Sequence, residues 1–320
     1  MTTESRFTNF AVKLHTLTAQ VAGAVYINGI QGLSVNDELQ TGLDGGDGLV
    51  YFTFGSLVSG NPTIGFSTSQ LKAFLDECGV EGMLVDSDVT HPGIDVYFQK
   101  MTQGGTRDAA AAGTHISTNA ANGILVPQVL SLSHQEVARL TASVVTRKSG
   151  AVDPIATDTA ANLPTGVFPS VDTNYTLGKL VLDSVEVKGL QSLEYNFGIN
   201  LDVVGGSSEI YPTHVSISAI SPSISFEAQD VNDIMAELTV EGKFYNATEV
   251  NFYAKKRTEG GSFVDNATAE HIAFSLGKCR VEWQTVGNDP KTISGQIIPW
   301  ETNSGSPVLP VTIDTAAVIP

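Results

Sequence analysis

Apolar and polar residues alternate along much of this chain, and a period of two is typical of half-buried β-strands. The alternation is clear from Val25 onward, where Gly29 or Gly32 would allow a bulge or bend. The same pattern, bounded by glycine, proline and short polar residues, predicts further strands. Strands are expected at Ala24 to Ile30, Thr63 to Phe66, Ile94 to Lys100, Ile124 to Leu132 and Ala138 to Thr146. The chain is therefore expected to be mainly β.

One stretch follows the helical period instead. Apolar residues recur there at i, i+3, i+4 and i+7, which predicts an amphipathic helix with one buried face. The run Ser67–Ser69 precedes it with three candidate N-caps, and Gly79 follows as a stop signal. The residues of the apolar face are Leu71, Phe74, Leu75 and Cys78.

Two irregular stretches interrupt the strands. The turn Asp44-Gly45-Gly46-Asp47-Gly48 offers glycines that tolerate positive φ. Leu33 to Leu39 and Leu49 to Leu57 are therefore predicted to form a long antiparallel hairpin around it. Farther on, Thr102 to Gly123 is rich in Gly, Ala, Thr and Asn, which predicts a long loop.

The chain repeats itself. Residues 25–82 align without a gap on residues 185–242, at an offset of 160, and glycines, prolines and aromatic residues coincide. Tyr97 to Gly105 then lies on Tyr253 to Gly261 at an offset of 156. His115 lies on His271 at the same offset. Self-similarity of this length predicts a duplicated domain.

The second copy repeats the helix as well. Its apolar residues would be Val231, Ile234, Met235 and Leu238, with Asp230 as the cap and Met235 as core filler. The predicted fold is therefore two tandem homologous β-sandwich or barrel domains, each with one short amphipathic helix packed on its sheet. The first domain is placed at residues 1–150 and the second at 176–305. An extended, proline-containing linker is predicted at 151–175, and a tail at 306–320.

The charge of the chain limits its partners. The formal net charge is −17, from 34 acidic and 17 basic residues, and such an excess repels nucleic acid. A protein that reads a DNA or RNA sequence would carry a basic footprint instead. Cys78 and Cys279 do not form a spaced pair, so both are predicted to be buried free thiols. Neither a signal peptide nor a transmembrane stretch is expected, and we expect synthesis in the cytoplasm.

No constellation in the sequence predicts catalysis. His115 and His271 have no second ligand at metal spacing and are expected to be structural. Gly45 to Gly48 lacks the helix and lysine of a phosphate loop, so a hairpin turn is the better interpretation. The carboxylate pairs Asp37 with Glu38 and Asp86 with Asp88 are expected in solvated loops. We expect no enzyme, no metal and no cofactor.

Several short motifs resemble a known family of structural proteins. They are Asp153-Pro154-Ile155, Leu163-Pro164, Thr176-Leu177-Gly178-Lys179-Leu180, Gly189-Leu190-Gln191-Ser192, Asn196-Phe197-Gly198-Ile199 and Tyr211-Pro212-Thr213. In these, and over about residues 123–299, the chain resembles the major tail proteins that form the tail tube of long-tailed double-stranded-DNA bacteriophages. The related inner tube of a contractile tail, a gene-transfer particle and a secretion-system ring remain open alternatives.

The resemblance implies a self-assembling virion protein. Family members with one domain form hexameric rings that stack into a tube, and sheets of neighbouring subunits merge around a lumen. A duplicated chain would form the same ring as a pseudo-hexamer of three copies. The implied partners are other copies of the chain, the tape-measure, tail-tip and terminator proteins, and double-stranded DNA that passes through without specific binding. Localisation in the phage tail, without membrane insertion, is also implied.

An acidic lumen would repel the phosphates of a genome in transit. The candidate lumen-facing carboxylates are Asp183, Glu186, Glu194 and Asp202. The candidate turns for contacts in the ring are Asp44, Gly45, Gly46, Asp47, Gly205 and Gly206. The alternative function is a tandem β-sandwich binding module for a glycan or a surface partner. Such a module would present an exposed aromatic residue, for which Trp300 is the candidate.

Overall fold

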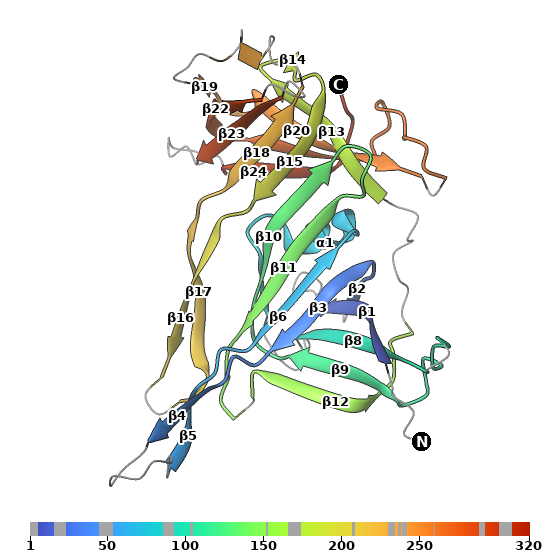
Figure 1. Cartoon of the computed structure of the whole chain (residues 1–320), viewed down its shortest axis with the longest axis vertical. Coiled ribbons are helices and arrows are strands. Elements are labelled where there is room, and N and C mark those ends of the chain that lie inside the picture. Colours follow the sequence, from blue (N-terminus) through green and yellow to red (C-terminus); the bar gives the residue numbers. More distant parts are fainter. Residues whose placement is uncertain are drawn as a thin grey trace.

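The fold of the chain is mainly β, as the alternation predicts (Figure 1). We analysed a computed structural model. It describes residues 6–15, 24–44, 54–85, 93–102, 105–151, 153–165, 174–206, 209–229, 234–235, 238, 242–258, 260–287, 292–300 and 309–320. Its strands form three large antiparallel sheets and two isolated hairpins.

A five-stranded sheet forms one layer in each half of the chain. In the amino-terminal half its order is β12-β9-β8-β1-β2. These strands are β1 (Arg6–His15), β2 (Ala24–Ile27), β8 (Ile94–Met101), β9 (His115–Ala120) and β12 (Ile155–Ala161). The carboxy-terminal half has the order β14-β13-β20-β21-β24. Its strands are β13 (Asn174–Leu182), β14 (Val185–Glu186), β20 (Val250–Arg257), β21 (His271–Leu276) and β24 (Val311–Ala317).

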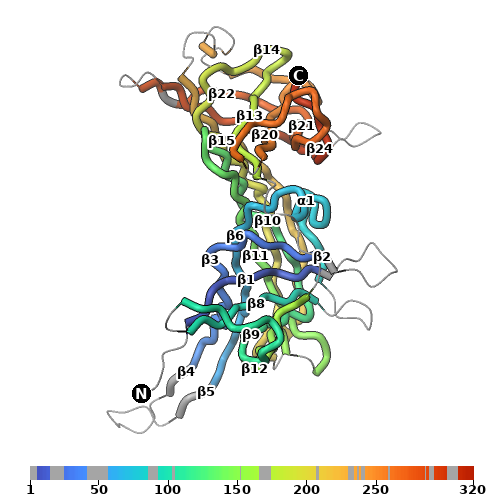
Figure 2. Tube along the Cα trace, turned by 90° about the vertical axis from the view of Figure 1, so that its right-hand side faces the viewer, coloured from blue at the N-terminus to red at the C-terminus, as the bar shows by residue number. Residues whose placement is uncertain are grey.

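A ten-stranded sheet, which we call the large sheet, forms the other layer and runs through both halves. Its order is β19-β22-β23-β18-β15-β10-β11-β6-β3, with β7 paired to β10 beside β15. Figure 2 shows the two lobes meeting at a waist around β10 and β15. The strands are β3 (Ile30–Asn36), β6 (Thr63–Thr68), β7 (Met83–Val85), β10 (Gly123–Ser133), β11 (Arg139–Thr146), β15 (Leu190–Asn196), β18 (Ser223–Ala228), β19 (Lys243–Tyr245), β22 (Lys278–Val286) and β23 (Ile293–Trp300).

Two long hairpins extend from the large sheet. The first arm consists of β4 (Gln40–Asp44) and β5 (Phe54–Ser59), and the second arm of β16 (Ile199–Gly205) and β17 (Pro212–Ile220). Their registers agree at the offset of 160, since Thr41 pairs with Leu57 as Leu201 pairs with Ile217. Both arms also have a register shift directly before these pairs. In Figure 1 the first arm projects away from the molecule, whereas the second lies along it.

The predicted first hairpin is confirmed, but its predicted bounds are wrong. The residues from Leu33 to Asn36 belong to β3, which pairs with β6 rather than with β5. The hairpin strands therefore begin only at Gln40 and end at Ser59. The predicted turn from Gly45 to Gly48 lies outside the described residues. Gly29 and Gly32 do have positive φ, of 64° and 59°, as a bend requires.

One continuous hydrophobic core lies between the layers and includes residues of both halves. The helix α1 (Leu71–Cys78) buries its four predicted apolar residues there and contacts β2, β10 and β24. It is followed by Gly79, with φ 59°, as predicted. None of the three predicted caps is the N-cap, because Gln70 occupies that position without a side-chain cap. Thr68, one of the three candidates, accepts a hydrogen bond from the backbone N–H of Gln70 at 3.0 Å.

Most of the predicted second helix, including its cap Asp230, lies outside the described residues. Ile234 and Leu238 are buried as predicted, and the N–H of Leu238 donates to the carbonyl of Ile234 at 2.8 Å. Met235 was expected to fill the core, and this prediction is wrong because 45% of it is exposed.

Three segments predicted to be irregular contain strands. β9 forms within the predicted loop, β12 within the predicted linker 151–175, and β24 within the predicted tail 306–320. β12 pairs with β9, and β24 with β21, so both segments belong to the sheets of their own halves. The sequences of β9 and β12 are made of Ser, Thr, Asn, Asp and Ala around single apolar residues. Alternation therefore cannot reveal them, because backbone pairing rather than burial places them.

Both thiols are predicted to be inert to a thiol reagent in the folded protein. Cys78 and Cys279 are free and at most 5% exposed. Burial raises the pKa of both thiols, that of Cys279 to about 12, so the reactive thiolate is scarce at neutral pH. We expect titration with a coloured disulfide reagent to detect no thiol before denaturant is added and both thiols afterwards. A thiol that reacts in the native protein would contradict the packing around it.

Candidate assembly interface

The large sheet crosses from one half of the chain to the other where β10 pairs with β15. Leu130 and Tyr195 lie opposite each other in this joint and are 0% and 2% exposed. Burial raises the pKa of the Tyr195 hydroxyl, so the ring stays neutral at physiological pH. The joint is therefore part of the core and not a surface contact. Its pairs are Val129–Asn196, Leu130–Tyr195, Ser131–Glu194, Leu132–Leu193 and Ser133–Ser192.

The second arm packs on β10 beside this joint. Val215 of β17 packs against Ile124 and Val126 of β10, and all three side chains are at most 5% exposed. Ile199 and Leu201 of β16 pack against the same cluster. The carboxy-terminal half thus places a hairpin over the sheet of the amino-terminal half.

Polar contacts fix the far end of the second arm. The backbone N–H of Gly60, at the base of the first arm, donates to the carbonyl of Ile210 at 2.9 Å. The ammonium of Lys148 lies 2.6 Å from a carboxylate oxygen of Glu209. This hydrogen bond raises the pKa of Lys148, so its ammonium stays protonated at physiological pH. The predicted turn residues Gly205 and Gly206 lie beside these contacts, because Gly206 accepts a hydrogen bond from the N–H of Glu209 at 3.2 Å.

The helix α1 joins the two halves from the other side. Lys72 donates to the hydroxyl oxygen of Thr315 on β24 at 2.9 Å. The Thr315 hydroxyl in turn donates to Asp76 of α1 at 2.6 Å. The two halves are therefore connected in three places, by the helix, by the β10–β15 joint and by the second arm.

Each end of the large sheet repeats one side of this joint. We call residues counterparts when they are related by the offset of 160, by 156 from β8 onward, or by 153 between β11 and β23, whose pairing to β10 and β22 agrees at that offset. β3 is then the counterpart of β15, and β22 of β10. The register shift between Pro127 and Val129 in β10 corresponds, at the offset of 156, to the shift between Trp283 and Thr285 in β22. This agreement places Thr285, Val286 and Gly287 in the positions of Val129, Leu130 and Ser131.

Both counterpart edges lack a strand partner within the part of the chain that the structure describes. On β10, Gly123–Leu125 pair with β7, and Val129–Ser133 with β15. On β22, Cys279–Val281 pair with β19, but the strand beyond Val281 pairs only with β23. β3 pairs only with β6 among the described strands. In this part of the chain the large sheet therefore ends in two open edges that match the two sides of the internal joint.

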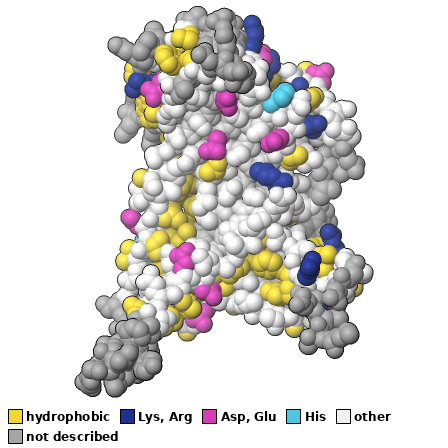
Figure 3. All heavy atoms as spheres, in the orientation of Figure 1, with side chains coloured by type: hydrophobic (Ala, Val, Ile, Leu, Met, Phe, Trp, Pro, Cys, Tyr) yellow, Lys and Arg dark blue, Asp and Glu magenta, His cyan; other side chains and the backbone are white. Residues whose placement is uncertain are grey.

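The face of the large sheet opposite the core carries short polar side chains. One row of neighbouring residues crosses five strands and consists of Ser131, Glu194, Ser225, Gln296 and Glu282. Arg280 lies on this face beside Glu282, at 3.0 Å. Figure 3 shows this side of the molecule, where both acidic and basic side chains are scattered over a largely uncharged surface. We call this surface the polar face.

The structure does not gather the four predicted lumen carboxylates. Asp183 and Glu186 lie at the β13–β14 turn of a five-stranded sheet, around a pocket that also contains Lys179. Glu186 forms an ion pair with Lys179 at 2.9 Å. Asp202 lies on the second arm, and only Glu194 lies on the polar face. Of the predicted turn residues, Asp44 ends β4, while Gly45, Gly46 and Asp47 lie outside the described residues.

Two carboxylates that accompany Glu194 on the polar face were not predicted. Glu227 of β18 lies beside Ser192 of β15, and Glu282 of β22 lies beside Gln296 of β23. A signal for them exists, because both alternate with buried apolar residues such as Phe226 and Val281. Reading every such alternation, instead of single acidic residues, would have found this face.

The two corresponding histidines are structural, as predicted. Nδ1 of His115 accepts the N–H of Lys100, and Nδ1 of His271 that of Lys256, each at 3.1 Å. Their Nε2 atoms contact the carbonyls of Ala109 and Asp265 at 2.8 and 2.9 Å. Among the described residues no cluster of His, Cys, Asp or Glu could hold a metal ion, and no helix is long and apolar enough to cross a membrane.

Comparison with known proteins finds no matching family model and no matching curated protein. The function must therefore be argued from the interface itself.

Proposed function

We propose that this protein self-assembles into rings that stack to form the tail tube of a bacteriophage. The observation that carries the proposal is the pair of open edges, β3 and the far half of β22, which match the two sides of the buried β10–β15 joint. When one edge of a chain is complementary to the opposite edge of another copy, the copies assemble head to tail. Closing the ring removes the exposed edges, which would otherwise aggregate.

The internal joint predicts the register between copies. Asn36, Val35 and Ser34 of one copy would lie opposite Thr285, Val286 and Gly287 of the next, as Asn196, Tyr195 and Glu194 lie opposite Val129, Leu130 and Ser131. The sheet path from β22 to β3 contains eight strands in each chain, so three copies would close a barrel of 24 strands. Such a barrel is wider than porins of 16–18 strands, which already leave an aqueous channel.

The proposal includes a duplicated domain. Two observations support it besides the sequence repeat, namely the identical order of corresponding strands in the two five-stranded sheets and the shared register of the two arms. Each copy would then contribute two of six similar ring positions. A trimer would be a pseudo-hexamer.

We further propose that the polar face lines the lumen and that the protein acts without catalysis. A face of serine, glutamine and glutamate offers duplex phosphates few of the cations through which proteins bind DNA. The net charge of −17 acts in the same direction. The partners would be further copies of the chain, the tape-measure, tail-tip and terminator proteins, and the passing genome, and the protein would reside in the virion.

Electron microscopy of concentrated, purified protein tests the proposal. We expect stacked rings with six lobes, and native mass measurement should give three chains in each ring. Six chains in each ring would keep the tube but overturn the role assigned to the duplication. Protein that stays monomeric at every concentration, including when tail-tip proteins are added, would overturn the tube.

One observation favours a second candidate, a binding module for a glycan. Phe244 and Trp300 are 69% and 36% exposed, and their ring centroids lie 6.1 Å apart in an edge-to-face arrangement. Exposed aromatic pairs are suited to stacking on ligands. A glycan array with a specific hit that Trp300→Ala abolishes would support this candidate against the tube.

A further inference from the structure

An exposed apolar patch adjoins the polar face, on the same side of the large sheet, in the carboxy-terminal half. It consists of Phe244, Ile298 and Trp300, which are 69%, 39% and 36% exposed. The guanidinium of Arg280 lies over the ring of Phe244, at 5.9 Å from its centroid. Exposed apolar patches of this kind mark binding surfaces more often than single exposed residues do.

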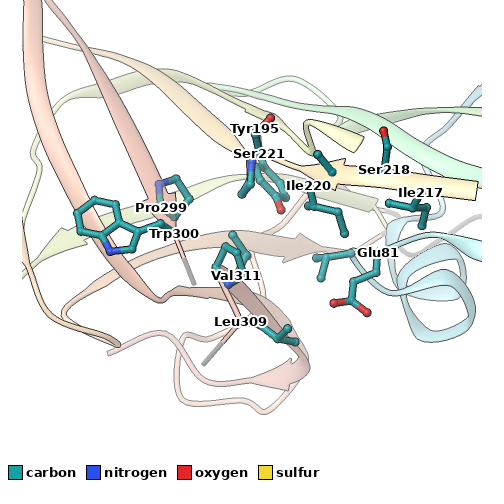
Figure 4. A pocket seen from close by; sticks show the side chains of 14 residues that line it. Glu81, Tyr195, Ile217, Ser218, Ile220, Ser221, Pro299, Trp300, Leu309 and Val311 are labelled. Atoms are coloured by element: carbon teal, nitrogen blue, oxygen red, sulfur yellow. The ribbon is translucent and has the colours of Figure 1, made fainter. Parts of the chain in front are cut away.

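The patch adjoins a pocket of about 480 Å³ at the base of the second arm. Figure 4 shows Trp300 and Pro299 at one side of the pocket, Leu309 and Val311 along the bottom of the view, and Ile220 at the other side. The lining is largely apolar. We call the patch and the pocket together the receptor surface.

In the amino-terminal half the second arm covers part of the corresponding surface. Ile124 and Val145 pair with each other as Arg280 pairs with Ile298, and Leu84 is the counterpart of Phe244. Ile124 is only 5% exposed, because Val215 and Leu201 of the second arm pack on it and on its neighbours, whereas Leu84 stays 49% exposed. The position of Arg280 and Ile298 is therefore covered by an arm in one half and open in the other.

The counterpart of the pocket is occupied too. Ile220, which borders the pocket, is the counterpart of Gly60. The end of the second arm packs against Gly60. The N–H of Gly60 donates to the carbonyl of Ile210, and the ring of Tyr211 lies 3.0 Å from the position that a Cβ on Gly60 would take. The first arm shares the register of the second but has no such seat in its own chain, since it projects away from both halves (Figure 1).

The sizes of the side chains fit an exchange. Where the second arm presents Ile199, Leu201 and Val215, the first arm has Leu39, Thr41 and Gly55. The receptor surface has bulkier side chains than the surface under the second arm, namely Phe244, Arg280 and Trp300. The smaller residues of the first arm would leave room for them. Leu39 is 48% exposed in the isolated chain and is available for burial.

We propose that the first arm of a second copy of this chain docks on the receptor surface, as the second arm docks within the chain. The inference rests on the proposed ring, but it concerns a contact separate from the β3–β22 edge. Docking would bury Thr41 in the way that its counterpart Leu201 is half-buried under the docked second arm. It would also cover Trp300. The arm then acts as a clamp across the contact between copies.

Trp300 itself can report the docking. Trp283→Phe leaves Trp300 as the one tryptophan of the chain, because the sequence contains two. We expect acrylamide to quench its emission several-fold less in assembled than in monomeric fractions separated by gel filtration. Thr41→Glu should restore quenching and weaken assembly by at least about tenfold, because docking would bury an unpaired carboxylate.

Gln40→Glu is the matched control. Gln40 is the counterpart of Asn200, which stays exposed on the docked second arm, and glutamate keeps the acceptor that Ser59 uses at 3.2 Å. It should change neither quenching nor assembly. If rings form but Trp300 stays quenchable, or if Thr41→Glu has no effect, the docking is overturned and the ring stands. If no assembly forms, both are overturned, and protection of Trp300 by a glycan in the monomer would identify the other occupant.

Discussion

Replacing Val286 with aspartate is expected to leave the chain folded but unable to form rings. In the isolated chain Val286 is 40% exposed at the open edge of β22, so a carboxylate there remains hydrated. Its counterpart Leu130 is fully buried in the internal joint, opposite Tyr195. In a ring Val286 would be buried in the same way, opposite Val35. Burying an unpaired carboxylate costs several kcal/mol, and a loss of about 3 kcal/mol weakens association by more than about 100-fold.

Val185→Asp is the control for this experiment. Val185 is 46% exposed, on β14 of a five-stranded sheet and away from both open edges. The two variants and the unmodified protein would be compared by sedimentation velocity over a range of concentrations, with circular dichroism to verify the fold. Rings that form equally well with Val286→Asp would exclude the predicted edge contact. Loss of rings with both variants would indicate a general effect of charge.

Much of the fold can be predicted from the sequence because burial imposes a period. β6 and β11 alternate buried and partly exposed residues, and α1 buries i, i+3, i+4 and i+7, so pattern and structure agree. β9 and β12 have no such period, since hydrogen bonding to a neighbouring strand places them. The residues at which strands begin and end are also difficult to predict from the sequence. β3 and β4 are separated by only three residues, where Glu38 has positive φ and the pairing partner changes from β6 to β5, and the composition of the chain does not record this change.

The candidate interface could be predicted only in part. The repeat predicts two similar units, but it does not predict that β10 in one half of the chain pairs with β15 in the other. That pairing depends on which edges remain after each sheet has formed. The predicted lumen carboxylates illustrate the same limit. Asp183 and Glu186 lie in a similar local sequence to Glu194 but belong to the opposite layer, and only the topology separates them.

The bases of the two arms show how one backbone conformation tolerates different residues. Asn36 and Asn196 each accept, through the side-chain oxygen, the N–H of the residue two positions on, at 3.3 and 2.9 Å. Those residues are Glu38 and Gly198, and both have positive φ, of 45° and 63°. Glutamate is strained there, whereas glycine is not. The conformation that starts each arm is therefore set by the asparagine.

Gly198→Ala is expected to be strongly destabilising and to detach the second arm. A Cβ on Gly198 would lie 1.9 Å from the carbonyl oxygen of Ser221 and 3.0 Å from the backbone nitrogen of Pro222, so the two strands would have to separate at their base. The strain of positive φ and the overlap together should cost about 2–5 kcal/mol. The measurement is urea unfolding of purified monomer, and limited proteolysis should cut the released arm. Glu38→Gly should act in the opposite direction, by about 0.5–1 kcal/mol, because it relieves strain where no overlap exists. If both substitutions lowered stability equally, the strand contact at Gly198 would not be what holds the second arm in place.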